Sequence, residues 1–400
     1  MDKEDKKTNV RLNVLIVGSV LLSIFLVLLT IACVMLIAQI RELGFRACLE
    51  EYWKPILLFS AMEFIIFWIG IVMIYITGAQ LGIKWRVIGA LCGMIPVVNI
   101  IVLIKLISVS FAEAAFEKKK LRVDQKRKNL QICKTKYPLF MVHGVFFRDY
   151  KHFNYWGRVP AELIKNGATI YYGDHQSAAA VEDSAEELAK RIRQIISETG
   201  CEKLNVIAHS KGGLDMRMAI AREGIAPYIA SITTVCTPHR GCEFADYLLY
   251  KAPEAVKDQV ANAYNSALRK LGDPDPDFIA GVTDLTAERC REMDAETSLF
   301  DYQKAGIYTH GVGSAMKKAS GGQFPLNMSY HLVNRFDGKN DGLVGDKSSV
   351  WGQDYTFLEN NKKRGISHGD MIDLNRENIP GFDVREFYVK LVEDLKNRGL

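Results

Sequence analysis

The chain has 400 residues, of which 48% are hydrophobic, and a formal net charge of +5 at pH 7. This length is sufficient for two structural units. The sequence contains no basic patch with interleaved aromatic residues, so we expect no nucleic-acid partner. Its 8 cysteines show neither the spacing of a disulfide framework nor that of a zinc finger, a pattern that favours a reducing compartment.

Three long apolar runs occupy the first part of the chain, at residues 13–40, 56–76 and 87–109. Each run reaches the roughly 20 residues that a helix needs to cross a bilayer. The first run is too long for a removable signal peptide and has no clear small-residue cleavage site. We therefore expect residues 1–115 to form a transmembrane region with about three helices.

A charged linker is expected at residues 116–136, because lysine and arginine crowd the stretch from Phe116 to Lys128. A solvated connector explains this composition, and so does a basic segment that attracts anionic lipid. Lysine and arginine accumulate on the cytoplasmic side of membrane spans. The two possible orientations place different sets of flanking lysine and arginine residues in the cytoplasm. The set that includes this cluster is the larger, so we expect a multi-pass protein of the cell membrane with a cytoplasmic globular domain. The extracellular face is the alternative.

From Tyr137 onward, short apolar strands alternate with amphipathic helices. This alternation predicts a mostly parallel sheet with right-handed crossovers and helices on both faces, an α/β domain over residues 137–400. The expected strands lie at residues 138–142, 168–172, 204–208, 229–235, 307–312 and 330–333. The expected helices lie at residues 156–166, 184–199 and 384–397, the second of them starting with a capping box at Ser184.

The most informative motif is Ala208–Gly213, with the sequence AHSKGG. It follows an apolar strand and opens a helix, which is the context of the nucleophile elbow G-x-S-x-G with alanine in the first glycine position. Small residues at Ala208 and Gly212 suit the strained turn that aims the serine hydroxyl outward. Ser210 is therefore the candidate nucleophile. We expect the side chain of the adjacent His209 to point away from the pocket.

A serine nucleophile requires a base and an acid, which in this fold follow the serine in the order acid, then histidine. Asp341 is the expected acid, in a loop that we expect to follow a strand, and Asp337 is its rival. His368 is the only histidine after Asp341, so it is the expected base. The histidine would take the serine proton while the aspartate holds the imidazole in the useful tautomer.

The segment His143-Gly144-Val145 follows the first strand of the globular domain. A loop in this place can supply one backbone N–H to an oxyanion, and the residue after the nucleophile supplies the other. Val145 and Lys211 are the expected donors. With the ordered serine, acid and histidine, these groups predict acyl-transfer chemistry on an ester.

The region from about Tyr137 to the C-terminus resembles bacterial triacylglycerol lipases of the α/β-hydrolase fold. Together with the three expected spans, the resemblance implies a membrane-anchored lipase or esterase that cleaves lipid or other hydrophobic acyl esters through an acyl-enzyme on Ser210. The alternatives are an acyltransferase that uses the same acyl-enzyme and an inactive membrane scaffold or sensor. The matching segments are 137–144, 153–157, 208–213, 237–241, 340–342 and 367–370.

The resemblance also implies a structural calcium bound by an acidic residue two positions after the histidine, where this chain has Asp370. Leu374 stands where an oxygen ligand would be useful, and no acidic residue shortly precedes Tyr330. The sequence therefore requires no cofactor and leaves Asp370 as the single candidate calcium ligand.

Residues 241–305 lie where these lipases place their lid. The expected helix 255–271 has an apolar face, which fits a lid that opens against lipid. A fixed cap helix packed on the core fits the pattern equally.

Overall fold

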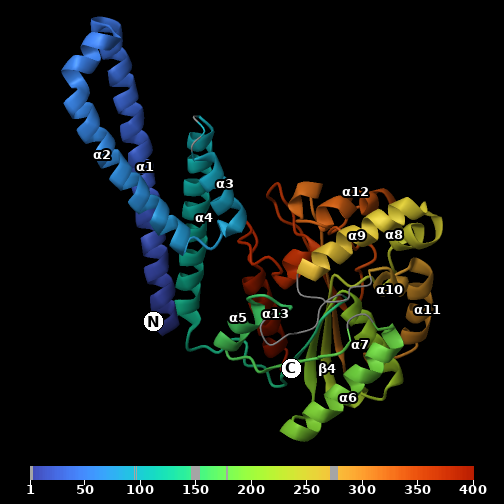
Figure 1. Ribbon diagram of the computed structural model, residues 1–400. Coiled ribbons are helices and arrows are strands. Elements are labelled where there is room, and N and C mark those ends of the chain that lie inside the picture. Colours follow the sequence, from blue (N-terminus) through green and yellow to red (C-terminus); the bar gives the residue numbers. More distant parts are fainter. Residues whose placement is uncertain (1–2, 94, 96, 146–153, 177–178, 271–277) are drawn as a thin grey trace. The chain divides into compact units, whose positions relative to one another are not determined.

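The computed structural model describes residues 3–93, 95, 97–145, 154–176, 179–270 and 278–400. Phe153, which belongs to one of the matching segments above, lies outside these residues, as does the last residue of the helix expected at 255–271. The chain divides into two compact units, Met1–Lys128 and Asn129–Leu400, and each unit is described by itself (Figure 1).

Helices account for nearly all described residues of the first unit. Three of them, α1, α2 and α4, are the described helices that are long and apolar enough to cross a membrane. This agrees with the expectation of three long apolar helices ahead of the globular domain. The helices are α1 (Lys3–Leu43), α2 (Phe45–Thr77), α3 (Gly82–Cys92) and α4 (Val98–Arg127).

The third expected span, residues 87–109, is wrong as a single helix, because the chain breaks between α3 and α4. Val97 has a φ of 67°, a backbone conformation that β-branched residues rarely adopt. Pro96, next to it in the sequence, lies outside the described residues, and proline lacks the N–H that a continuing helix requires. Helix α4 instead runs on through the charged stretch to Arg127.

Small residues and an ion pair connect the described helices of this unit. A Cβ atom on Gly18 would lie 2.8 Å from Met73 Cβ, so α1 and α2 approach closely at this glycine. Arg11 Nη1 of α1 lies 2.6 Å from Glu113 Oε1 of α4. The other oxygen of Glu113 accepts a hydrogen bond of 2.8 Å from the backbone N–H of Gln80. Glu113 therefore connects α1, α4 and the segment between α2 and α3.

The second unit contains a six-stranded sheet in the order β2-β1-β3-β4-β5-β6 among the described residues. Every neighbouring pair is parallel, which confirms the α/β fold class. The strands are β1 (Leu139–Val142), β2 (Ile170–Tyr172), β3 (Leu204–His209), β4 (Ile229–Val235), β5 (Tyr308–Ser314) and β6 (Asp354–Leu358).

Helices cover both faces of this sheet (Figure 1). Successive strand side chains point to opposite faces, and a separate apolar core lies on each. Phe140 of β1 packs with α6 and α7, whereas Leu139 and Met141 pack with α5 and α13. Each fully buried apolar side chain contributes roughly 1.5–3 kcal/mol. These helices are α5 (Val159–Lys165), α6 (Val181–Thr199), α7 (Lys211–Arg222) and α13 (Val384–Asn397).

The segment between β4 and β5 is helical and includes the helix expected over the pocket. In this segment, Tyr264 of α9 stacks on Phe278 of α10, with ring centroids 4.3 Å apart. The helices here are α8 (Glu243–Asp246), the π-helix η2 (Tyr247–Lys251), α9 (Glu254–Lys270), α10 (Phe278–Thr283) and α11 (Ala287–Thr297). The remaining elements of this unit are α12 (Leu326–Phe336) and the 3₁₀ helices η1 (Ala226–Tyr228), η3 (Ala319–Gly321) and η4 (His368–Ile372).

Two expected elements differ from the structure. The strand expected at 330–333 is wrong, because these residues lie inside helix α12. A short apolar run cannot by itself distinguish a strand from a helix. Helix α6 begins at Val181 and has no side-chain cap, so the capping box at Ser184 is also wrong. Instead, the Ser184 hydroxyl accepts a hydrogen bond from Lys211 Nζ at 3.2 Å.

Candidate active site

Ser210 lies at the sharp turn between β3 and α7, with a φ of 55° and a ψ of −131°. A Cβ atom on Gly212 would overlap the carbonyl oxygen of His143, and one on Gly213 would overlap the side chain of Thr237. The Thr237 hydroxyl donates a hydrogen bond of 2.8 Å to the carbonyl oxygen of Ser210. Only small residues fit this turn, and the surrounding chain stabilises its strained backbone.

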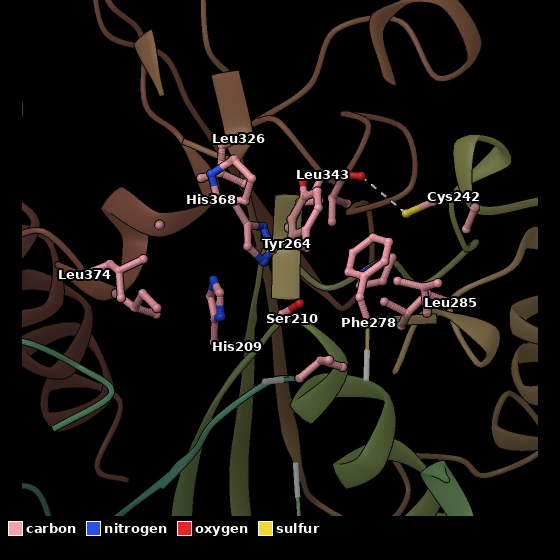
Figure 2. A pocket seen from close by; sticks show the side chains of 18 of the residues that line it. His209, Ser210, Cys242, Tyr264, Phe278, Leu285, Leu326, Leu343, His368 and Leu374 are labelled. Carbon is pink, nitrogen blue, oxygen red and sulfur yellow. Dashed lines mark hydrogen bonds between the residues drawn. The ribbon is translucent and has the colours of Figure 1, made fainter. Parts of the chain in front are cut away.

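His368 and Asp341 form a hydrogen-bonded pair, with His368 Nδ1 at 2.8 Å from Asp341 Oδ2. The other carboxylate oxygen accepts hydrogen bonds from the backbone N–H groups of Leu343 at 3.0 Å and Val344 at 2.8 Å. Asp341 is 1% exposed. The carboxylate is therefore fixed by the backbone and in turn fixes the imidazole ring. His368 and Ser210 line the same pocket (Figure 2).

Asp337, the rival acid, has a different role in the structure. It caps the C-terminus of α12, and its Oδ1 accepts a hydrogen bond of 3.0 Å from the backbone N–H of Glu243. Asp341 lies in the loop after helix α12 rather than after a strand, which corrects the expected context. Asp341 is therefore bonded to His368, whereas Asp337 is bonded to the first residue of α8.

Cys236 is a neighbour of this pair that nothing in the sequence singled out. Ligand atoms of Cys236, Asp341 and His368 lie within 4.8 Å of one another. Burial raises the pKa of the Cys236 thiol well above its usual value, and the charge of Asp341 raises it further. The thiol therefore stays protonated, whereas metal ligation requires the thiolate. We interpret Cys236 as a packing neighbour of the hydrogen-bonded pair.

The expected oxyanion donors belong to two segments that meet beside Ser210. Val145 lines the pocket, and Lys211 is the first residue of α7. A Cβ atom on Gly144 would lie 2.8 Å from Ser210 Cβ, so glycine allows the two segments to approach. The ammonium group of Lys211 is buried and lies 2.6 Å from Asp215 Oδ1. Its charge is thus neutralised by a carboxylate one helical turn further along α7.

His143, which precedes this loop, is kept neutral. Its ring stacks on His175 with centroids 4.0 Å apart. Burial lowers the pKa of His143 to about 3, and the neighbouring His175 lowers it as well. At neutral pH the loop expected to supply an oxyanion donor therefore begins at an uncharged, buried imidazole.

His209 does not point away from the pocket, which corrects the expectation. It lines the pocket with Ser210, and its ring centroid lies 4.5 Å from that of His368. The Tyr155 hydroxyl lies 2.7 Å from His209 Nδ1 and holds the ring in place. Burial lowers the pKa of His209 well below its usual value, as does the charge of His368, against the smaller effect of the His368 carbonyl. His209 is therefore neutral.

The pocket in front of Ser210 is mostly apolar and encloses an empty volume of about 1010 Å³, part of it open to solvent. Apolar walls with a few convergent polar groups are typical of sites for hydrophobic ligands. Its apolar and aromatic lining residues include Ala245, Leu248, Tyr264, Phe278, Val282, Leu285, Leu326, Leu343, Ile372 and Leu374.

The residues around Asp370 do not fit a calcium ion. Asp370 Oδ2 accepts hydrogen bonds from Arg364 Nη1 at 3.0 Å and from the backbone N–H of Ser367 at 2.7 Å. The other guanidinium nitrogen of Arg364 donates to Glu377 at 2.8 Å. Leu374 turns its apolar side chain into the pocket. The Arg364 guanidinium thus pairs with the carboxylate that a calcium ion would need.

Chelation should therefore have little effect on stability. We expect EDTA to shift the melting temperature of the full chain in detergent micelles by less than about 2 °C. Arg364→Ala should lower it by several degrees, because it leaves the buried Asp370 carboxylate without its cation. The measurement is a thermal melt with and without EDTA. A large drop on chelation that calcium restores, and that Asp370→Ala abolishes, would show that a calcium site exists.

No family model matches this chain. A triacylglycerol lipase from Pseudomonas fragi is 33% identical over 302 residues, which cover 66% of this chain and 98% of the relative. A triacylglycerol lipase from Pseudarthrobacter phenanthrenivorans is 28% identical, covering 55% of this chain and 84% of that protein. The crystal structure of the mature Bacillus licheniformis lipase BlEst2 is 21% identical with a TM-score of 0.48, covering 64% of this chain and 92% of that one.

The Pseudomonas fragi relative is similar over nearly its entire length, and the match covers 66% of this chain. That unit has the parallel sheet, the strained serine turn and the histidine–aspartate pair described above. The chain therefore belongs to the triacylglycerol lipase family, and its globular unit is an ester hydrolase with the α/β-hydrolase fold.

Proposed function

We propose that the protein is a membrane-anchored serine hydrolase that cleaves lipid esters or other hydrophobic acyl esters through an acyl-enzyme on Ser210. The observation that carries this proposal is the 2.8 Å hydrogen bond between His368 and the buried Asp341, in an apolar pocket that also holds Ser210. Relatives described as triacylglycerol lipases support a lipid ester as the substrate class.

In the proposed reaction, Ser210 Oγ attacks the ester carbonyl carbon while His368 Nε2 takes its proton. Asp341 stabilises the imidazolium that forms. The N–H groups of Val145 and Lys211 donate hydrogen bonds to the oxyanion. The C–O bond to the alcohol then breaks, and His368 protonates the leaving oxygen. A water molecule, activated by the same histidine, attacks the acyl-enzyme and releases the acid.

Hydrolysis and acyl transfer share the acyl-enzyme, so product analysis distinguishes them. We expect the wild-type protein in detergent to convert a short acyl ester mainly to the free acid, even when glycerol is added as a competing acceptor. A product dominated by the new ester would identify an acyltransferase. No turnover of any acyl ester would leave the inactive scaffold as the correct description.

Membrane anchoring is supported by α1, α2 and α4. Arg11 of α1 and the backbone N–H of Gln80, which follows α2, both bond to Glu113 of α4. We therefore place the N-terminus and the charged end of α4, which leads into the hydrolase unit, on the same side of the membrane. Lysine and arginine favour the cytoplasm, and the larger set of these residues lies on the same side as the hydrolase unit. We propose that the hydrolase acts at the inner leaflet. The larger set is Lys3, Lys6, Lys7, Arg11, Lys84, Arg86, Lys118, Lys119, Lys120, Arg122, Lys126, Arg127 and Lys128; the smaller is Arg41, Arg46 and Lys54.

Thiol labelling of intact cells tests this orientation. Ser320 is exposed on η3, so Ser320→Cys introduces an accessible thiol with little change in volume. Cys201 is half-buried and is replaced by serine to reduce background. We expect a membrane-impermeant maleimide to label this variant only after lysis. Labelling of intact cells to the same extent as lysed cells would place the hydrolase outside.

A further inference from the structure

Helix α4 is longer than the hydrocarbon core of a bilayer requires. It is continuous from Val98 to Arg127 (Figure 1) and has 30 residues. At a rise of about 1.5 Å per residue, the helix is about 45 Å long, whereas the hydrocarbon core is about 30 Å thick. In a membrane, the C-terminal part of α4 therefore extends past the core and through the layer of lipid headgroups.

One side of α4 carries a stripe of exposed residues that recur every three or four positions, the spacing of a single helix face. The cation of this stripe inside the apolar part, Lys105, lies over the Trp85 ring, 5.6 Å from its centroid. In a membrane, the apolar residues of the stripe contact the acyl chains of the lipid. The stripe ahead of the charged segment includes Ile101, Ile104, Ser108, Phe111 and Ala115.

The same stripe becomes basic one helical turn after Ala115. Lys119, Arg122 and Lys126 continue its spacing, and all three are exposed. Lys119 lies four residues after Ala115, a rise of about 6 Å. The headgroup layer beside the hydrocarbon core is about 5–7 Å thick, and lysine and arginine side chains extend well beyond their own backbone. These ammonium and guanidinium groups are therefore placed at the height of the lipid phosphates.

Other cations of this segment are bonded within the described structure. Lys120 Nζ lies 2.7 Å and Arg127 Nη2 lies 2.9 Å from Asp124 Oδ1, and these three residues are buried. Lys118 Nζ donates a hydrogen bond of 2.8 Å to Asn13 Oδ1. The carboxylate of Asp124 is thus paired with buried cations and does not neutralise the exposed stripe.

Glu117 does not neutralise the stripe either. It lies two positions before Lys119, and two positions turn a helix by about 200°, so its side chain leaves from the opposite side of α4. Lys119, Arg122 and Lys126 form no ion pair with any residue that the structure describes. The stripe therefore presents three cations without a counter-charge.

We propose that Lys119, Arg122 and Lys126 form a binding site for the phosphate group of an anionic phospholipid. The three cations are spread over about 10 Å of the helix axis, and basic clusters next to a membrane helix bind anionic headgroups. A membrane lipid is the occupant because the site continues the apolar stripe of the same face, along which its acyl chains can lie. The inference rests on the proposed membrane insertion and is independent of ester hydrolysis.

Lipid binding to the full chain in detergent micelles tests the proposal. The measured quantity is the apparent Kd of phosphatidylglycerol, titrated by native mass spectrometry. We expect the wild-type protein to bind this lipid at least about tenfold more tightly than phosphatidylcholine with the same acyl chains, because the choline headgroup is zwitterionic. Each cation near a charged surface contributes a factor of about five. Lys119→Gln/Arg122→Gln/Lys126→Gln should therefore raise the Kd of phosphatidylglycerol about 50-fold to 100-fold.

A matched control removes the same charge from another part of the first unit. Arg41, Arg46 and Lys54 are exposed near the turn between α1 and α2, and Arg41→Gln/Arg46→Gln/Lys54→Gln should keep the Kd within about threefold of wild type. If the triple variant in α4 does not fold, single substitutions still report on the site. Arg122→Gln should raise the Kd about fivefold, whereas Arg122→Lys, which retains the charge, should change it less than about twofold.

Several outcomes would overturn the site. One is an unchanged Kd in the α4 variants, and another is an equal loss in the control variant. Equal affinity of the wild-type protein for the two lipids is a third. Displacement of phosphatidylglycerol by an equal concentration of glycerol 3-phosphate would assign the cations to a free phosphate instead of a lipid. A chain that stays soluble without detergent would refute membrane insertion together with the site. Ester hydrolysis enters none of these measurements, so its failure would leave the inference intact.

Discussion

Ser210→Ala and His368→Ala should each lower kcat/KM for a short acyl ester by about 10⁴-fold or more. The serine supplies the attacking oxygen and the histidine takes its proton, so neither loss can be compensated by the rest of the site. Both variants should remain folded, because alanine retains the Cβ atom at the strained Ser210 turn. Initial rates on a chromogenic butyrate ester give the result, and near-ultraviolet circular dichroism monitors the fold.

Residual activity separates this account from its alternatives. If Ser210→Ala retains more than about a tenth of the wild-type rate, another nucleophile must carry the reaction. If both variants lose activity because they unfold, the melting temperature will show it. His310→Ala is a suitable control, because His310 lies on β5 and bonds to the Thr356 hydroxyl at 2.9 Å, outside the pocket.

Asp341→Asn should lower kcat by about 10⁴-fold, because an amide donor facing Nδ1 favours the wrong imidazole tautomer. Asp337→Asn should change kcat less than about twofold, since the asparagine oxygen can still accept the hydrogen bond from the Glu243 backbone. These two isosteric substitutions lie four residues apart and control for each other. Steady-state kinetics on the same ester provide the measurement. A greater loss in Asp337→Asn would exchange the roles of the two carboxylates.

Local sequence patterns predicted the strands, helices and turns whose conformation depends mainly on neighbouring residues. The expected bounds of β4 and α13 match the structure, because β4 is a short segment rich in β-branched residues and α13 has apolar residues at helical spacing. The turn at Ser210 follows from small residues that a strained backbone requires. Gly200 ends α6 in the left-handed conformation, as its sequence position indicated.

The features that could not be predicted from the sequence depend on contacts between residues that are far apart in the chain. The direction of the His209 ring depends on Tyr155, which lies 54 residues earlier in the chain. Asp370 is paired with the guanidinium group of Arg364. The position of that guanidinium group cannot be inferred from the spacing of the residues in the sequence. Residues 330–333 form part of a helix in which Val333 packs against Leu248, Tyr264 and Phe278, which belong to the helical segment between β4 and β5. Only the fold establishes this contact.

Covalent labelling of Ser210 tests the central claim most directly. The full chain in detergent is treated with a fluorophosphonate, and its intact mass is measured. We expect one added phosphonyl group on the wild-type protein, located on Ser210 by peptide mapping, none on Ser210→Ala, and strongly slowed labelling of His368→Ala. Equal labelling of Ser210→Ala, or ester hydrolysis by a wild-type protein that the reagent neither labels nor inhibits, would contradict it.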